Sequence, residues 1–153
     1  MDINFFKPKL GDIVLMQELV KSEVDKGIIL LRTSDEMATT IRSYTAVEVD
    51  GKLAGFCALH IHSVNLAEIR SLVVSEKYRG LGLGKTLVKK CLQEGALLEV
   101  KEVLSLTYQK DFFEGIGFQV ISKESIPEHK IWADCIRCKH FPVCDEVALL
   151  YKL

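Results

Sequence analysis

A glycine-rich loop between a predicted strand and a predicted helix is the feature that most constrains this chain. The segment Arg79-Gly80-Leu81-Gly82-Leu83-Gly84-Lys85 follows the apolar run Leu72-Val73-Val74 and leads into a helical stretch from Lys85 to Leu98. Three glycines in five residues let the backbone turn sharply and bring its N–H groups close to a ligand. Successive amides in such a turn, with a helix N-terminus behind them, form a concavity that binds anions. Since Arg79 and Lys85 add positive charge, the loop is predicted to hold a pyrophosphate.

The spacing of the glycines narrows the kind of pyrophosphate site. A nucleotide P-loop reads Gly-x-x-x-x-Gly-Lys-Thr, and one residue fewer separates Gly80 from Gly84. A dinucleotide fingerprint reads Gly-x-Gly-x-x-Gly, whereas the glycines here are evenly spaced. The alternative to a ligand-binding loop is a flexible surface turn. The pattern that does fit the segment is Arg-x-x-Gly-x-Gly after a strand that ends in Val-Val.

The composition favours a single cytoplasmic domain. The chain has 153 residues, of which 48% are hydrophobic, enough for one domain with a real core, and we expect residues 1–153 to form it. A formal net charge of −1 argues against nucleic acid or a membrane surface as partner. No apolar run approaches the length of a bilayer span, and the N-terminus does not resemble a secretion signal. Five cysteines without such a signal predict a reducing compartment.

The apolar periodicity predicts a mixed α/β sheet covered by helices. Asp50-Gly51 is a strong hairpin signal between two strands, and Ser34 is predicted to cap the second helix. The run from Ile28 to Leu31 leads to Arg32, and residues 126–145 form an irregular polar tail with three cysteines. Strands are expected over 3–6, 46–49, 53–62, 66–74, 103–107, 118–121 and 146–152, and helices over 12–24, 34–41, 85–98 and 110–114.

The glycine loop and the order of these elements resemble the GNAT acetyltransferase superfamily. Within it, the chain is most similar to amino-acid N-acetyltransferases of the N-acetylglutamate synthase kind, in the short form without an amino-acid kinase domain. The similarity rests on the stretches 29–34 (Ile-Leu-Leu-Arg-Thr-Ser), 68–74 (Glu-Ile-Arg-Ser-Leu-Val-Val), 112–118 (Phe-Phe-Glu-Gly-Ile-Gly-Phe) and the tail 126–146. It implies a mostly antiparallel sheet that is flanked by helices and splayed at the cofactor strand. It also implies acetyl-CoA as co-substrate and L-glutamate as the amine that is acetylated.

The resemblance assigns the cofactor-binding residues. Backbone groups of Leu72, Val73 and Val74 would pair with the pantetheine amides as another strand would, and an N–H near Leu72 or Val73 would polarise the thioester carbonyl. The pyrophosphate would lie on the loop, that is, on Arg79, Gly80, Leu81, Gly82, Leu83, Gly84 and Lys85.

The resemblance also points to Glu68 as the base that deprotonates the amine, directly or through water. An ordinary exposed glutamate titrates near 4.3, so Glu68 would need burial to act near neutral pH. The alternative is a surface carboxylate, or one that pairs with Arg70 or Lys77.

Arg32 is the candidate for binding the substrate carboxylate, because a guanidinium matches a carboxylate in bidentate geometry. An isolated arginine after an apolar run is otherwise a solvated surface residue. Arg70 and Ser71 are weaker substrate-binding candidates, since strand alternation places them on opposite faces. A β-bulge in this strand would change which of them faces the site.

The general acid has no clear candidate. The superfamily usually places a Tyr on the short helix near the leaving thiolate, where this chain has Phe112 and Phe113. Either Tyr108 substitutes, or the thiolate leaves without a donor, which a thiol pKa near 8.5 tolerates.

The remaining cysteines and histidines receive structural interpretations. Cys135, Cys138 and Cys144 have partial zinc spacing, but a lid with the cysteines as apolar fillers is favoured, so no metal is predicted. Cys57 and Cys91 are expected in the core, and His60 and His62 on the surface of one strand face.

The resulting prediction is an acetyl-CoA-dependent enzyme for the first acetylation step of arginine biosynthesis, with direct attack of the amine in a ternary complex. The alternatives are another small amine, a protein N-terminus, or a non-catalytic acyl-CoA sensor. The assembly state, a homodimer included, and regulation by arginine are left open.

Overall fold

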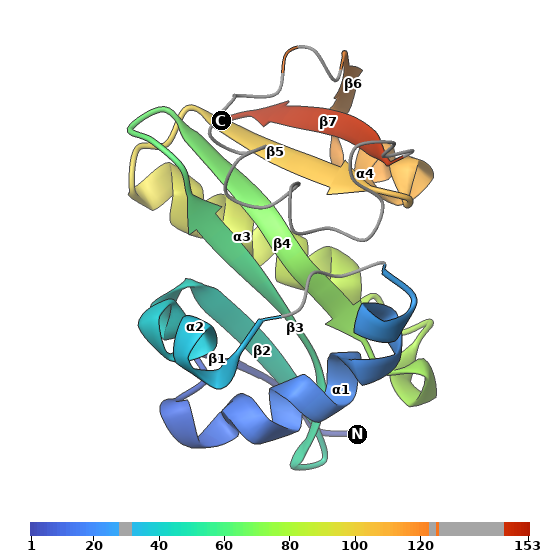
Figure 1. Cartoon of the computed structure of the whole chain (residues 1–153). Coiled ribbons are helices and arrows are strands. Elements are labelled where there is room, and N and C mark those ends of the chain that lie inside the picture. Colours follow the sequence, from blue (N-terminus) through green and yellow to red (C-terminus); the bar gives the residue numbers. More distant parts are fainter. Residues whose placement is uncertain (28–31, 123–124, 126–145) are drawn as a thin grey trace.

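One seven-stranded sheet runs through the part of the chain that the computed structural model describes, namely residues 1–27, 32–122, 125 and 146–153 (Figure 1). Its strands lie in the order β1-β2-β3-β4-β5-β7-β6. They are β1 (Ile3–Phe6), β2 (Tyr44–Val49), β3 (Lys52–Ile61), β4 (Leu66–Val74), β5 (Glu102–Thr107), β6 (Gln119–Ile121) and β7 (Val147–Lys152). Every neighbouring pair is antiparallel except β4 and β5, which are parallel. The expected mixed, mostly antiparallel sheet is confirmed.

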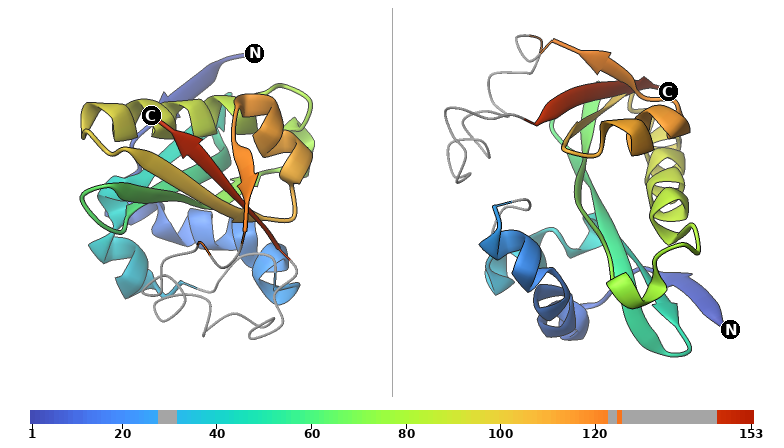
Figure 2. Two further views of the ribbon diagram at one scale, coloured as in Figure 1. Left: turned by 90° about the horizontal axis from the view of Figure 1, so that it is seen from above. Right: turned by 90° about the vertical axis from the view of Figure 1, so that its right-hand side faces the viewer.

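Helices cover both faces of this sheet (Figure 2). One face carries α1 (Ile13–Asp25) and α2 (Ser34–Thr39), and the other carries α3 (Leu83–Leu97) and α4 (Lys110–Ile116). Three short 3-10 turns are η1 (Leu10–Asp12), η2 (Ile41–Ser43) and η3 (Glu76–Tyr78). No helix of the described residues is long and apolar enough to cross a membrane.

Strand alternation divides the apolar side chains between two cores, one on each face. Phe56 and Ala58 of β3 pack with Met16 of α1 and Met37 of α2, whereas Cys57 and Leu59 pack beneath α3. Each fully buried large side chain contributes roughly 1.5–3 kcal/mol relative to its exposed state. The two cores therefore fix the position of β3 and β4 between the two helical layers.

Two helix starts differ from those predicted. Thr33, not Ser34, caps α2: its Oγ1 accepts from the Glu36 N–H at 3.1 Å, and the Glu36 carboxylate accepts from the Thr33 N–H at 3.1 Å. The reason is the Thr-x-x-Glu spacing of a capping box. Helix α3 begins at Leu83 rather than Lys85, because Gly82 takes a left-handed conformation as its N-cap. The stretch 28–31 and the cysteine tail 126–145 lie outside the described residues.

A β-bulge interrupts β4 at Ser71. Ala58 of β3 lies opposite Arg70, but Phe56 lies opposite Val73, so two residues of β4 face one residue of β3. Ser71 has φ 53°, a left-handed value that is uncommon for a residue other than glycine. The extra residue reverses the alternation of side chains beyond it, so that Arg70 and Ser71 both line cavities on the α1/α2 face. The bulge that the sequence analysis raised is therefore present. The prediction that Arg70 and Ser71 lie on opposite faces of the sheet is wrong.

The sheet splays at the C-terminal half of β4. The parallel ladder between β4 and β5 ends at Ile69 and Ser105, after which the two strands diverge (Figure 1). Beyond that point, within the described chain, the ladder of β4 continues with β3 alone. The splay predicted at the cofactor strand is confirmed, and it leaves one edge of residues 70–74 turned toward the gap.

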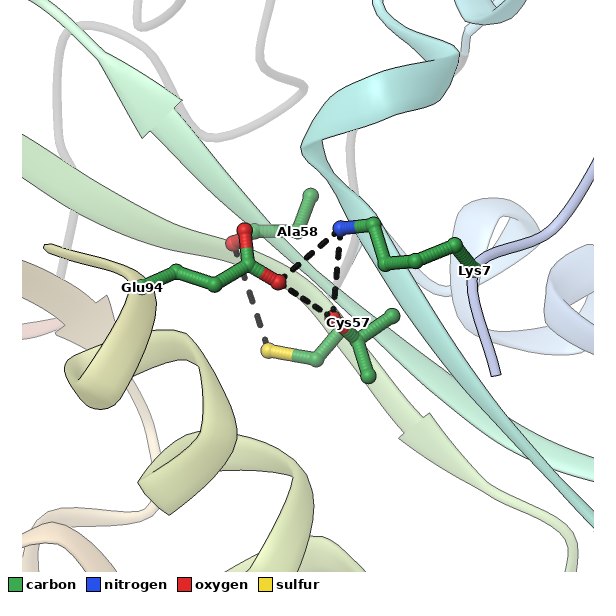
Figure 3. Close-up of polar contacts among 5 residues, drawn as sticks. Lys7, Cys57, Ala58 and Glu94 are labelled. Atoms are coloured by element: carbon green, nitrogen blue, oxygen red, sulfur yellow. Dashed lines mark hydrogen bonds and ion pairs between the residues drawn. The ribbon is translucent and has the colours of Figure 1, made fainter. Parts of the chain in front are cut away.

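A polar contact ties α3 to β1 and β2 on the face opposite the bulge's cavities. Glu94 accepts from Lys7 Nζ at 3.0 Å and from Thr45 Oγ1 at 3.1 Å (Figure 3). Cys57 lies beside this contact and is fully buried, and burial raises the pKa of its thiol well above its usual value. Cys91 is buried as well, so the core placement of both cysteines is confirmed.

Candidate active site

The glycine loop lies between the open edge of β4 and the N-terminus of α3, as the sequence predicts. Gly80 and Gly82 have φ 87° and 73°, and a Cβ at either position would meet no atom within 4 Å. Both are therefore required for backbone conformation and not for space. Helical bonding begins with the Thr86 N–H, which donates to the Gly82 carbonyl at 3.1 Å, so helix geometry turns the preceding first-turn amides toward the loop. This is the arrangement of an anion site.

Gly84 has a different role from the other two loop glycines. A Cβ there would lie 3.5 Å from the Phe112 ring and 3.6 Å from Val74 Cγ2. These are ordinary van der Waals distances, so the start of α3 packs against Phe112 of α4 and Val74 at the end of β4. The loop is thus held against the divergent end of β4, so Leu72, Val73 and Val74 lie next to the predicted pyrophosphate site.

Two cavities on the α1/α2 face flank Arg32. The larger, of about 380 Å³, lies against α1 and includes Phe56 and Ser71 in its lining, and the smaller, of about 140 Å³, includes His60 and Arg70. Arg32 and Tyr44 line both cavities. The structure therefore brings together all three residues predicted to bind substrate, namely Arg32, Arg70 and Ser71.

Tyr44 reports on the electrostatics between these cavities. Burial raises its pKa above the usual 10.0, while the charges of Arg32 and Arg70 and a hydrogen bond with Thr40 act in the opposite direction. The phenol therefore stays neutral near pH 7. Because both guanidinium groups act on one hydroxyl, the two cations face a shared space. The sequence analysis did not identify Tyr44, and its place at the start of a strand gives no signal for a site residue.

Glu68 is buried, with 3% of its surface exposed. Its Oε1 lies 2.7 Å from His62 Nε2 and 3.6 Å from Arg70 Nε. Of the alternatives to a base, the surface carboxylate is wrong, whereas the pairing with Arg70 is present. In the described chain Glu68 does not line the two cavities, whereas its neighbours His60 and Arg70 do. The role of Glu68 as base, acting directly or through water, stays a prediction.

The surface interpretation of His62 is wrong, since only 2% of its side chain is exposed. His60 lies opposite Glu68 in the antiparallel register, and alternation then places His60, His62, Glu68 and Arg70 on one face of the sheet. The rings of His60 and His62 meet edge to face with centroids 4.7 Å apart. The register follows from the connection between β3 and β4, and applying it to the sequence would have identified His62.

The region of the leaving group is mostly apolar. Phe112 packs by Gly84, and Phe113 is buried in the core under α3. Tyr108 follows β5 and is 40% exposed. Whether Tyr108 donates the proton or the thiolate leaves without a donor stays open. Cys135, Cys138 and Cys144 lie outside the described residues, so the choice between lid and zinc site also stays open.

Comparison with known proteins places this geometry in a family. The model of the acetyltransferase (GNAT) family matches residues 15–118. An uncharacterized N-acetyltransferase of Chlorobaculum tepidum is 37% identical over 95% of this chain and 93% of its own length. An amino-acid acetyltransferase of Mycobacterium tuberculosis is 28% identical over 75% of this chain and 67% of its own.

Among solved structures, the N-acetylglutamate synthase of Neisseria gonorrhoeae, complexed with coenzyme A and N-acetyl-glutamate, superposes with a TM-score of 0.86 at 23% identity. All of this chain is covered, but it spans 35% of that synthase. The likeness to the synthase carries the fold alone, whereas the family match extends over two thirds of the sequence. The glycine loop, the splayed and bulged strand and this match lead to one conclusion: the chain belongs to the GNAT acetyltransferase family.

Proposed function

We propose that this chain transfers the acetyl group of acetyl-CoA to the α-amino group of L-glutamate, with residues 1–153 as one catalytic domain. The observation that carries the proposal is the pair of arginines, Arg32 and Arg70, which line one small cavity beside the splayed end of β4. A substrate with two carboxylates suits two guanidinium groups. The amino-acid acetyltransferases among the relatives support an amino acid as the acceptor.

The acyl donor is assigned to the gap next to β4. The open edge of Leu72, Val73 and Val74 offers backbone groups to the pantetheine amides, and the amides at the start of α3 receive the pyrophosphate between Arg79 and Lys85. Coenzyme A is bound by the Neisseria structural neighbour, which supports this placement. Holding the thioester beside the amine can lower the barrier by roughly 7 kcal/mol or more.

The chemical step is direct attack without an acyl-enzyme. Glu68 takes a proton from the substrate ammonium through a water, and the neutral nitrogen attacks the thioester carbon. A backbone N–H near the bulge, at Leu72 or Val73, stabilises the oxyanion that forms. The nitrogen gives up its second proton to water, the C–S bond breaks, and the thiolate leaves and takes a proton from solvent or from Tyr108.

The product, N-acetyl-L-glutamate, places the reaction at the first acetylation of arginine biosynthesis, in the cytoplasm. A homodimer is compatible with this role. The cavity that Arg32 and Arg70 line has a volume of about 140 Å³, which suits a small amino acid.

A thiol-release assay with acetyl-CoA and each of the twenty amino acids tests the proposal. We expect release that depends on L-glutamate, with N-acetyl-glutamate identified by mass. If thiol is released with a different amino acid and not with L-glutamate, that amino acid is the substrate. Binding of acetyl-CoA without release for any amine would favour a non-catalytic sensor.

Gly82→Ala should raise the KM for acetyl-CoA about tenfold. A Cβ at φ 73° costs roughly 1–2 kcal/mol, and relaxation of that strain moves the amides that receive the pyrophosphate. Gly51→Ala is the matched control, because Gly51 has φ 80° in the β2–β3 hairpin turn and the same free space around it. Steady-state kinetics and thermal melting separate the two effects: both variants should lose stability, and the cofactor KM should change in Gly82→Ala alone. If the KM for acetyl-CoA were the same in Gly82→Ala as in Gly51→Ala, the backbone at Gly82 would not be part of the cofactor site.

A further inference from the structure

We propose that His62 is the positioning residue of Glu68: it donates an Nε2–H hydrogen bond to Glu68 Oε1 and holds the carboxylate ionised and in one orientation. This inference rests on the proposed function, in which Glu68 is the base. It adds a residue that no motif in the sequence indicates.

The contact is short and shielded from water. His62 Nε2 and Glu68 Oε1 are 2.7 Å apart, and 2% and 4% of the two side chains are exposed. A hydrogen bond to a charged acceptor is stronger than one between neutral groups, and burial removes the competition of solvent. An exposed pair of this kind would contribute little. The carboxylate is therefore held by a contact that water does not replace.

The two strands make this contact specific. His60 lies opposite Glu68 in the register, and His62 directly follows Ile61, the last residue of β3. The backbone at this end is fixed by the His62 N–H, which donates to the Leu66 carbonyl at 2.9 Å. The edge-to-face contact of the His60 ring, at 4.7 Å between centroids, further restrains the His62 imidazole. The imidazole is thus oriented before substrate binds.

One oxygen of Glu68 carries both contacts. Its Oε1 lies 2.7 Å from His62 Nε2 and 3.6 Å from Arg70 Nε. A donor that favours the ionised carboxylate extends the pH range in which the base is active toward acid. Loss of the donor should consequently move the acid limb of the rate profile to higher pH.

Other charged and titratable groups face this pair and are part of its pH response. In the described chain His60 contacts the His62 ring and Arg70 lies 3.6 Å from Glu68. Tyr44 on β2, Arg32 before α2 and Glu36 on α2 line the cavity that His60 and Arg70 also line. None of them changes when His62 is replaced. A shift that appears in His62 variants alone therefore reports on the His62–Glu68 contact.

The test compares His62→Ala with His62→Gln, whose amide nitrogen can still donate to Glu68. With acetyl-CoA and the amine found in the amino-acid screen, His62→Ala should lower kcat about 10- to 100-fold. It should also move the acid limb up by about one pH unit, with the KM for acetyl-CoA unchanged. His62→Gln should restore most of kcat and return the limb toward its original position. Glu94→Gln, which alters a polar contact on the opposite face, is the control and should leave both unchanged.

A second readout does not need turnover. Nitrogen NMR of the imidazole rings, with His62→Gln for assignment, should show a protonated Nε2 at His62 whose shift changes in Glu68→Gln. Equal losses in His62→Ala and His62→Gln without a shifted limb would overturn the proposal, as would an Nε2 signal that is indifferent to Glu68. If no amine is acetylated at all, the proposed function fails, while the NMR result still decides the contact.

Discussion

Glu68→Gln is expected to lower kcat by about 100-fold or more, with a KM for acetyl-CoA within about twofold of the original. The amide cannot accept the ammonium proton, yet it keeps the shape of a buried side chain of β4. The loss should be smaller at high pH, where more of the amine is already neutral. The measurement is the pH dependence of kcat under saturating amine and acetyl-CoA.

Glu114→Gln is the matched control, because Glu114 is a glutamate on the surface of α4, with Lys110 at 3.9 Å. It should have no effect on kcat. A different pattern in Glu68→Gln would change its assignment: an unchanged kcat with a raised amine KM means that Glu68 orders Arg70 for substrate binding and does not act as the base. The contact of 3.6 Å with Arg70 Nε makes this comparison necessary.

Arg32→Ala should raise the KM for L-glutamate about 100-fold, equivalent to ~2.8 kcal/mol, because the substrate carboxylate loses a charge-assisted bidentate partner. The KM for acetyl-CoA should stay nearly constant, since Arg32 lines the two cavities on the α1/α2 face, away from the glycine loop. Initial-rate kinetics with each substrate varied in turn provide both values.

Arg42→Ala controls for the loss of a positive charge near the site, because Arg42 is exposed on the neighbouring turn η2. Its effect on either KM should be small. An equal rise of both KM values in Arg32→Ala would point to a general distortion and remove Arg32 from the carboxylate role. Arg70 would then be the remaining candidate in the smaller cavity.

The elements that follow from local chemistry could be predicted from the sequence. Alternation and helical periodicity gave the strands and helices, and Asp50-Gly51 gave the hairpin. The glycine loop was found because left-handed φ at Gly80 and Gly82 needs glycine. By contrast, the left-handed φ at Ser71 has no such marker, so the bulge could be raised as an alternative but not located.

The arrangement around Glu68 depends on contacts between segments far apart in the chain. Arg32, Tyr44 and Arg70 come from three separate segments and meet only through the packing of α1 and α2 on the sheet. Tyr44 therefore gave no signal as a site residue. His62 was misjudged because the two histidines were considered apart from the neighbouring strand, whose register brings Glu68 opposite His60.

A crystal structure of this protein with coenzyme A and N-acetyl-L-glutamate tests the central claim most directly. We expect a carboxylate of the product within hydrogen-bonding distance of the Arg32 guanidinium, the pantetheine along residues 72–74, and the pyrophosphate on the amides that follow Gly82. The acetylated nitrogen should lie on the Glu68 side of the smaller cavity. A product bound away from Arg32 and Arg70, or a cofactor outside the gap beside β4, would contradict the account.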